Sequence, residues 1–228
     1  MTHIECKIDN HIATILINRP HKANAYTPSM LLKFNQLWDT IEKEASIAII
    51  SSTGSGAFCA GADLNEMNKA RAEDALDLLS QKLFNRIAQS HVVSIAAIHG
   101  PAVAGGFEIT LACDLRVASP TAWFQLPEVS KGLIPAAGGC TRLTSLLGSS
   151  IAKGVILGGD RILAKQAHNW GLVHRLSSTP QQEALDWAQV ILQKDALALT
   201  LAKQVLTAPS LEAERLAEAI LYERRNSF

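Results

Sequence analysis

Residues 100–114 read GPAVAGGFEITLACD, and this stretch carries a junction between a strand and a helix. A buried apolar strand, VSIAAIHG (93–100), leads into it, and the pair Gly105-Gly106 opens an apolar helical run. The first N–H groups of such a helix have no intrahelical acceptor, and the helix dipole makes them attractive to a negative oxygen. Glycine also lets a ligand approach the backbone closely. The stretch therefore predicts either a plain tight turn or half of an oxyanion-binding site.

Two carboxylates near glycine-rich turns are the candidate acid–base groups. Glu108 lies in the first turn of the apolar helix, where it is either a group stabilised by the dipole or a buried general acid or base whose pKa rises toward neutrality. Glu128, in LPEVSKG, is either a solvated loop residue or a second catalytic carboxylate. The loop AFCAGADL (57–64) is the candidate for the other half of the oxyanion site.

Strands and helices alternate around this stretch to about residue 175, which predicts an α/β fold with parallel strand pairing. A helix should start at Thr27-Pro28, a second should cover about 72–90, and a third should end at Gly148. The expected strands share apolar runs bounded by turn residues. They are HIATILIN (11–18), IAIIS (47–51), VSIAAIHG (93–100), LRVAS (115–119) and AWFQLP (122–127).

The chain changes character near residue 178, which predicts a core over 1–178 and a helical region over 179–228. Thr179 to Gln182 read as a capping box with Pro180 at the first helical position. Two helical stretches broken near Pro209 should follow.

Those stretches keep an apolar helical face that packs either on the core or on another subunit, and we favour a subunit interface. Charged residues such as Lys203 and Arg224 are expected on solvated faces. The apolar positions are Leu185, Ala188, Leu192, Leu199, Ala202 and Leu206.

Bulk composition excludes several classes of protein. The chain has 228 residues, 48% of them hydrophobic, with 21 basic and 21 acidic side chains. This balance gives no attraction for nucleic acid or an anionic membrane, and no apolar run of about 18 residues is present to span a bilayer. The start, MTHIECKIDN, lacks a secretory signal pattern, so a cytoplasmic protein is expected. The four cysteines are far apart and should be reduced, mostly buried thiols.

Several catalytic motifs are absent, among them the P-loop, G-x-S-x-G, H-E-x-x-H and a complete G-x-G-x-x-G. The histidines are scattered, and His99 at a strand end is expected to be a core residue with satisfied hydrogen bonds. We therefore expect no metal site. Glycine-rich turns and carboxylates remain as the candidate chemistry.

Taken together and in order, five stretches resemble the crotonase, or enoyl-CoA hydratase/isomerase, family. The resemblance covers roughly residues 4–176 and implies a spiral of ββα units with a helical C-terminal region that makes trimers, often paired into hexamers. The matching stretches are NRPHKANAYT, AFCAGADLNEM, AIHGPAVAGGFEITLACDLRVAS, FQLPEVSKGLIPAAGG and GDRILAKQAHNWGLV.

The resemblance assigns binding roles to the glycine-rich loops. The N–H groups of Ala62 and Gly105 match the family's oxyanion hole, which polarises a thioester carbonyl. The backbone around Ala60, Asp63 and Leu64 matches the segment that holds the adenine of coenzyme A. The substrate implied is an acyl-CoA thioester, with no cofactor beyond the coenzyme A that the substrate carries.

The two glutamates match the family's catalytic pair, and retaining both resembles the hydratases. Glu108 would activate water at C3 of a 2-trans-enoyl thioester, while Glu128 would deliver a proton to C2. Ala136 stands where the hydratases usually have a glycine whose N–H helps to place the water. Asn65 stands where some relatives have a lysine near the CoA phosphates, and the chain stops at LYERRNSF, about where relatives continue into a last basic helical segment.

Ala136 keeps other reactions of the same family open. One is isomerisation of an enoyl-CoA double bond, which needs the oxyanion hole and a single glutamate. Another is hydration or dehydration of carrier-protein thioesters in polyketide biosynthesis. A protein that binds acyl-CoA without turnover is disfavoured because both glutamates are present, and a hydrolase using Cys59 is disfavoured because no pattern places a histidine near it.

Overall fold

The computed structural model describes residues 3–67, 71, 73 and 76–226. Within them the strands are β1 (Ile4–Asp9), β2 (Ile12–Ile17), β3 (Ile47–Ser52), β4 (Val93–Ile98), β5 (Ala102–Val103), β6 (Leu115–Ala118), β7 (Trp123–Gln125), β8 (Ile162–Leu163) and β9 (Arg175–Leu176). The helices are the short 3₁₀ segments η1 (Pro20–Lys22) and η2 (Glu128–Lys131), with α1 (Pro28–Glu44), α2 (Leu64–Met67), α4 (Leu79–Gln89), α5 (Gly105–Ala112), α6 (Gly139–Gly158), α7 (Ala164–Asn169), α8 (Pro180–Leu192), α9 (Ala196–Thr207) and α10 (Leu211–Asn226).

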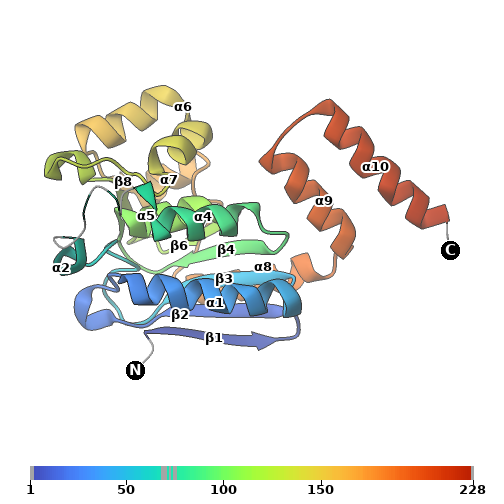
Figure 1. Cartoon of the computed structure of the whole chain (residues 1–228), viewed down its shortest axis with the longest axis horizontal. Coiled ribbons are helices and arrows are strands. Elements are labelled where there is room, and N and C mark those ends of the chain that lie inside the picture. The colour runs from blue at the N-terminus through green and yellow to red at the C-terminus, as the bar shows by residue number, and fades with distance from the viewer. Residues whose placement is uncertain (1–2, 68–70, 72, 74–75, 227–228) are drawn as a thin grey trace.

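A six-stranded sheet, ordered β1-β2-β3-β4-β6-β9, forms the centre of the molecule (Figure 1). β1 pairs with β2 antiparallel, and every later pair in this sheet is parallel. A smaller sheet, β5-β7-β8, lies beside it. The predicted α/β fold with parallel pairing is confirmed.

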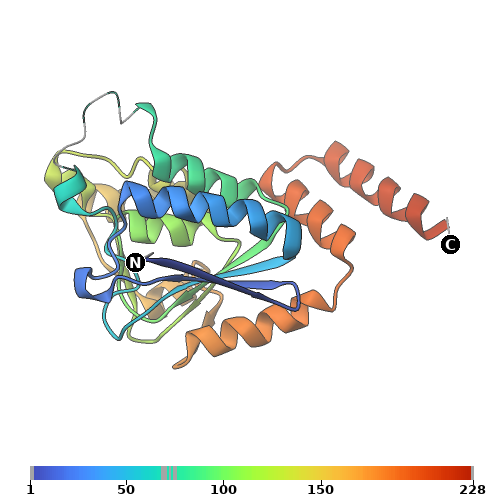
Figure 2. The ribbon, with the colours of Figure 1, turned by 60° about the horizontal axis from the view of Figure 1, so that its bottom comes forward.

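Helices cover both faces of the large sheet, as the turned view in Figure 2 shows. The helices α1, α4 and α5 lie over one face, while α8 lies against β3, β4 and β6 on the other. Every residue of β3 and β4 is buried, because a parallel strand covered on both faces has no solvated side. Alternate residues therefore enter two separate apolar clusters, one under each helical layer.

Local sequence signals fix several helix boundaries. Thr27 caps α1, its Oγ1 accepting from the N–H of Met30 at 3.3 Å, with Pro28 in the first helical position. The helix predicted over 72–90 is observed in part: α4 begins only at Leu79, because Asp77 lies in a turn and Leu78 is non-helical, and positions 72, 74 and 75 lie outside the described residues. The helix expected to end at Gly148 instead resumes after it. Gly148 has φ 77° and ψ 161°, which kinks α6 without ending it.

The start of α8 differs from the predicted capping box. Thr179 makes no side-chain cap hydrogen bond, although Pro180 does take the first helical position. Gln182 donates to Asp186 at 2.8 Å, and Gln181 donates to the Ser51 hydroxyl at 2.8 Å. This end of the helix is therefore held by the hydrogen bond from Gln181 to the sheet and by the apolar packing of α8, and not by the predicted capping box.

The C-terminal region contains an additional break that the sequence analysis missed. Two helices were expected, but in the described chain α8, α9 and α10 follow one another. The extra break precedes α9, where the Asp195 carboxylate accepts from the N–H of Ala198 at 2.9 Å as an N-cap. The apolar face of α8 packs on its own sheet, with Ala184 and Ala188 fully buried, so these positions pack on the core and not on another subunit as was favoured. The boundary at residue 178 stays a prediction.

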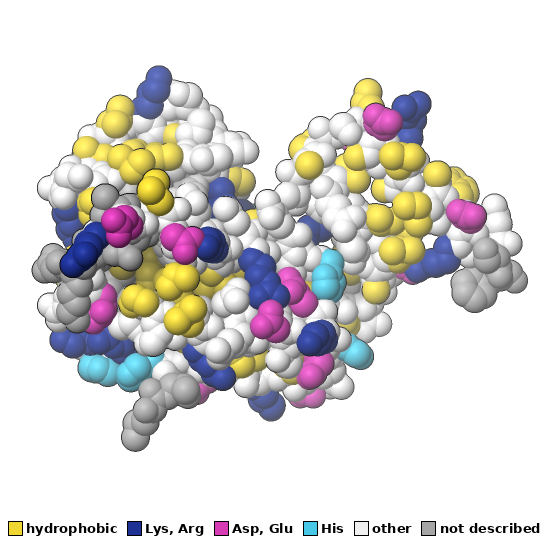
Figure 3. All heavy atoms as spheres, viewed as in Figure 1, with side chains coloured by type: hydrophobic (Ala, Val, Ile, Leu, Met, Phe, Trp, Pro, Cys, Tyr) yellow, Lys and Arg dark blue, Asp and Glu magenta, His cyan; other side chains and the backbone are white. Residues whose placement is uncertain are grey.

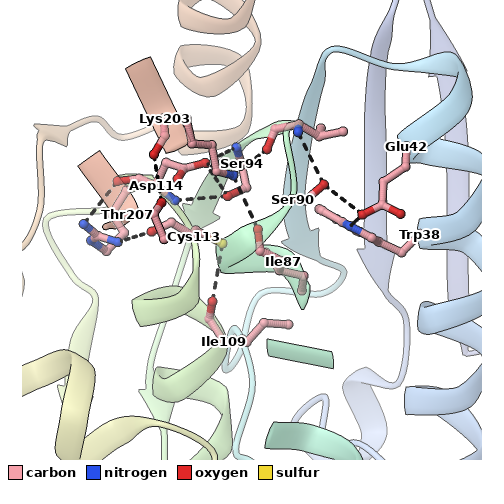
Figure 4. Close-up of polar contacts among 12 residues, drawn as sticks. Trp38, Glu42, Ile87, Ser90, Ser94, Ile109, Cys113, Asp114, Lys203 and Thr207 are labelled. Atoms are coloured by element: carbon pink, nitrogen blue, oxygen red, sulfur yellow. Dashed lines mark hydrogen bonds and ion pairs between the residues drawn. The ribbon is translucent and has the colours of Figure 1, made fainter. Parts of the chain in front are cut away.

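Lys203 is buried, which corrects the prediction that it is solvated. Only 7% of the residue is exposed, and its Nζ lies 2.8 Å from a carboxylate oxygen of Asp114. The same ammonium donates to the carbonyl of Val92 at 2.6 Å and to that of Ile87 at 3.4 Å (Figure 4). Ser94 donates to Asp114 from both its N–H and its hydroxyl, which holds the carboxylate in place. These contacts fasten α9 to the body of the fold.

Beyond this attachment, α9 and α10 stand away from the sheet and its helices (Figures 1 and 2). Apolar side chains gather on this helical pair in the space-filling view of Figure 3. No helix within the described ranges is long and apolar enough to cross a lipid bilayer. His99 also departs from expectation, because its Nε2 is buried and finds no hydrogen-bond partner among the described residues.

Candidate active site

One cavity of about 1150 Å³ gathers every site residue that the sequence suggested. It opens between the glycine-rich loop before α2, the start of α5 and the segment from η2 to α6, and its lining is mainly apolar. The predicted residues in its wall are Ala60, Ala62, Asp63, Leu64, Gly105, Glu108, Glu128 and Ala136. Segments that are far apart in the chain thus meet around a single space of ligand size.

The two loops expected to form an oxyanion hole are in direct contact. A Cβ placed on Gly61 would lie 3.0 Å from the amide nitrogen of Gly105 and 2.9 Å from the Cβ of Ala104. Gly61 also has φ +92°, so both space and backbone require glycine there. No acceptor for the N–H of Ala62 or of Gly105 is found in the described part of the chain. Two adjacent donors therefore remain available at the cavity wall.

The start of α5 is held in an unusual backbone conformation. Ala104 has φ 52° and ψ −130°, a region that a residue with a Cβ occupies at a cost of about 1–3 kcal/mol. Its N–H donates to Gln125 at 2.9 Å, and its carbonyl accepts from Phe107 and Glu108. A Cβ on Gly106 would lie only 2.0 Å from the carbonyl oxygen of Cys59. This close approach leaves room only for glycine at position 106 and brings the start of α5 against the loop that contains Cys59.

Glu108 is the more deeply buried carboxylate. It is 4% exposed, and its Oε1 accepts from the N–H of Gly139 at 2.8 Å. Burial raises the pKa of the Glu108 carboxyl to about 7; the Gly139 N–H opposes this rise, while the nearby charge of Glu128 adds to it. A carboxyl with a pKa near neutrality can take and return a proton under ordinary conditions.

Glu128 faces the same cavity from η2. It is 9% exposed, and its buried Oε2 has no hydrogen-bond partner within the described residues. Burial raises the pKa of this carboxyl too, and Lys131 acts in the opposite direction. An unpaired buried carboxylate oxygen is costly to a fold, so its place in a cavity wall indicates a ligand or a chemical role.

The loop expected to hold coenzyme A is braced from the protein side. Asp63 forms an ion pair with Arg19 at 2.6 Å and accepts from the N–H of Asn65 at 2.9 Å. The hydrogen bond from Arg19 lowers the pKa of the Asp63 carboxyl, so this side chain is ionised and occupied. Ala60 uses its N–H on the carbonyl of Ala23, whereas Leu64 is exposed. The Asp63 side chain therefore positions this loop, and the loop's contact with coenzyme A stays a prediction.

Ala136 also lies in the wall, half buried. Its carbonyl accepts from the side-chain amide of Gln81 at 2.6 Å, which ties the loop before α6 to α4. Its own N–H finds no acceptor in the part of the chain that the structure describes. The peptide is thus held from one side and leaves a donor free on the other.

Some lining residues were missed by the sequence analysis. Lys22, Arg71 and Lys131 bring positive charge to the wall, and Tyr26 brings a phenol. Lysine in the turn NRPHKANAYT was a usable signal for an anion, but the place of Tyr26 depends on tertiary contacts alone. No group of three or more histidine, cysteine, aspartate or glutamate side chains positioned to hold a metal ion is found among the residues described.

Comparison with known proteins agrees with this geometry. The chain matches the family model for enoyl-CoA hydratase/isomerase over residues 7–227. It is 32% identical over 230 residues to the short-chain-enoyl-CoA hydratase of Clostridium acetobutylicum, which covers 94% of this chain and 88% of that protein. It is 34% identical over 209 residues to the 2,3-dehydroadipyl-CoA hydratase of Escherichia coli, covering 90% and 82%. A crystal structure of enoyl-CoA hydratase from Bacillus anthracis matches with a TM-score of 0.90 and 31% identity, covering 97% of this chain and 90% of that one. The chain therefore belongs to the enoyl-CoA hydratase/isomerase family and is an enzyme of the hydratase or isomerase type.

Proposed function

We propose that this enzyme adds water across the double bond of 2-trans-enoyl-CoA thioesters to give 3-hydroxyacyl-CoA. The observation that carries the proposal is the meeting of Glu108 and Glu128 with the unpaired N–H groups of Ala62 and Gly105 in one apolar cavity. Relatives named short-chain-enoyl-CoA hydratase and 2,3-dehydroadipyl-CoA hydratase support the reaction class.

The hole acts on the thioester oxygen. The N–H groups of Ala62 and Gly105 donate hydrogen bonds to this oxygen. These hydrogen bonds become stronger as negative charge develops on the oxygen. Such donors in a water-poor site contribute about 3–4 kcal/mol each to the transition state. Polarising the carbonyl makes C3 electrophilic and stabilises the enolate that forms when a nucleophile adds there.

The carboxylates handle the protons. Ionised Glu108 accepts a proton from the water that attacks C3, and protonated Glu128 delivers a proton to C2. The water's hydroxyl thus forms the new bond to C3, the double bond becomes a single bond, and the two glutamates exchange protonation states. Glu108 has a pKa of about 7, close to the value that favours proton transfer in both directions.

The wall provides for the rest of the substrate. Lys22, Arg71 and Lys131 offer positive charge to the phosphates of coenzyme A, and the backbone around Ala60 and Leu64 would receive the adenine. We also propose that the active form is a homotrimer or a hexamer.

Ala136 bears on the choice between hydration and isomerisation. Its methyl group takes space that the hydratases leave open, but its N–H remains free to donate to a water. The free donor favours hydration, because isomerisation has no need of a water-positioning group.

The decisive experiment follows the absorbance of the conjugated enoyl thioester when the protein is mixed with crotonyl-CoA. We expect rapid loss for the wild-type chain and loss of activity by at least about 100-fold in Glu108→Gln and in Glu128→Gln, since each removes one proton-transfer step. Glu212→Gln, the same change on the exposed surface of α10, should behave as wild type.

Two results would overturn hydration. One is no loss of absorbance with enoyl-CoA substrates of any chain length. The other is conversion of a 3-enoyl-CoA into the conjugated 2-enoyl-CoA without formation of a hydroxyacyl product, which would establish an isomerase.

A further inference from the structure

Tyr26 touches both halves of the oxyanion hole. Its N–H donates to the carbonyl of Gly61 at 2.9 Å, and its own carbonyl accepts from the N–H of Asp63 at 2.8 Å. These bonds form a parallel bridge between Tyr26 and Ala62 and engage the residues on either side of Ala62. The backbone of Tyr26 thereby keeps the Ala62 N–H facing away from the bridge.

The side chain of the same residue lies against Gly105. A Cβ placed on Gly105 would meet the Tyr26 phenol oxygen at 2.0 Å, closer than any other atom. The ring packs edge-on against Phe84 with centroids 6.1 Å apart and interplanar angle 90°. Tyr26 is 9% exposed, and this remaining surface is part of the cavity wall. The phenol is thus fixed beside the second N–H of the hole.

The hydroxyl has a proton to give. The buried hydroxyl of Ser80 lies close enough to the phenol to lower its pKa, and a serine O–H can donate to a phenol oxygen. When Ser80 is the donor of this pair, the phenol's own proton is left for another acceptor. Burial, with the charges of Glu108 and Glu128, raises the pKa of Tyr26, so the group stays protonated when the carboxylates are ionised. A protonated phenol in the cavity wall, with Ser80 donating to it, can donate to a ligand in the cavity.

We propose that the Tyr26 hydroxyl is a third hydrogen-bond donor of the oxyanion hole, acting on the thioester oxygen beside the N–H groups of Ala62 and Gly105. The inference rests on the proposed function only in taking a thioester as the ligand. The thioester oxygen gains negative charge as the enolate forms, and it then accepts hydrogen bonds more strongly. A third donor therefore stabilises the transition state more than the bound substrate. Tyr26 is therefore a catalytic residue, and its hydroxyl is the group that matters.

The test compares carbonyl polarisation with and without the hydroxyl. Glu108→Gln serves as the background, because it is expected to bind a thioester without turning it over. A 2,4-dienoyl-CoA bound to this protein should show an absorbance maximum shifted to longer wavelength, and adding Tyr26→Phe should reduce the shift by roughly a third, since one of three donors is lost. In the otherwise wild-type chain, Tyr26→Phe should lower kcat/KM about 10- to 100-fold through kcat, with KM within about twofold.

The chain supplies a matched control, because its one other tyrosine, Tyr222, is exposed on α10. Tyr222→Phe should change neither the shift nor kcat. The proposal is overturned if the Glu108→Gln/Tyr26→Phe protein keeps the full absorbance shift. It is also overturned if the Glu108→Gln protein causes no shift in the bound thioester. If Tyr26→Phe reduces the shift while the wild-type chain hydrates no enoyl-CoA, the donor role stands and the proposed hydration fails.

Discussion

Glu108 is buried, and the proposed reaction needs it ionised; these two requirements oppose each other. In the folded protein its pKa is about 7, against an ordinary value of 4.5, because burial disfavours the charged form. The folded state therefore binds this proton more tightly than the unfolded state does. The contribution of Glu108 to the stability of the folded state is therefore most favourable below the ordinary pKa, and it is lost as pH rises from about 4.5 to about 7.

The first prediction concerns Glu108→Gln, which is neutral at every pH and can still accept from Gly139. Above neutral pH the variant should be more stable than wild type, because it avoids the buried charge. The free energy of unfolding of the variant, relative to that of wild type, should increase by on the order of 2 kcal/mol between about pH 5 and about pH 8. Urea denaturation across this range measures it.

The exposed change Glu212→Gln is the control, and its effect on stability should not vary with pH. A Glu108→Gln protein whose stability runs parallel to wild type across the range would show that Glu108 is not held near neutrality. Loss of activity together with gain of stability is the expected signature of a residue kept for chemistry.

Part of this site could be predicted from the sequence and part could not. Gly105, Glu108 and the loop through Ala62 lie in short motifs whose glycines and carboxylates have local meaning. Tyr26 carries no such signal, because its proposed role arises from a bridge to Ala62 and a contact with Gly105, both distant in the chain. The raised pKa of Glu108 likewise follows from tertiary burial.

At the scale of elements, local caps were predictable only where tertiary contacts do not compete. Thr27 caps α1 as its sequence indicates, whereas Thr179 leaves α8 uncapped and Gln181 bonds to the sheet instead. Asp195 could have indicated the start of α9, because aspartate is a common N-cap residue. The apolar helical pattern continues on both sides of it, so the break was not predicted. Lys203 could not have been placed, because a lysine on a helix is ordinarily solvated.

The attachment of α9 through Lys203 gives a second prediction. Lys203→Met keeps the apolar stem but removes the ammonium that bonds to Asp114, Ile87 and Val92. The change leaves a partly buried carboxylate and two carbonyls without that donor, so the free energy of unfolding should fall by about 2–4 kcal/mol. Hydrogen exchange should rise more in α9 than in α1, where no contact has changed.

Lys194→Met is the matched control, since Lys194 is exposed in the turn after α8 and its replacement should change neither the free energy of unfolding nor the exchange rates. Equal loss of protection in α1 and α9 would contradict a local role for Lys203. An unchanged urea midpoint would show that apolar contacts alone hold α9.

At the scale of the whole molecule, α10 lacks the packing that its length requires. Within the described chain no residue of this helix is buried, and its main neighbour is α9. An isolated helix of this length is marginal in water, so it needs an apolar partner. Its exposed side chains include Leu211 at 78%, Leu216 at 60% and Ile220 at 46%. A second copy of the chain is the partner that the proposed trimer supplies.

The last prediction is therefore about mass in solution. Light scattering should give three or six times the 24.5 kDa of one chain. Changing both Leu216 and Ile220 to glutamate places charge one helical turn apart on α10, which should bring the mass down to that of a single chain. Leu32→Glu makes the same kind of change on α1, where the side chain is 52% exposed, and should leave the assembly intact. A wild-type chain that runs as a monomer at every concentration would contradict the interface, because the apolar surface of α10 would then have no partner to bury it.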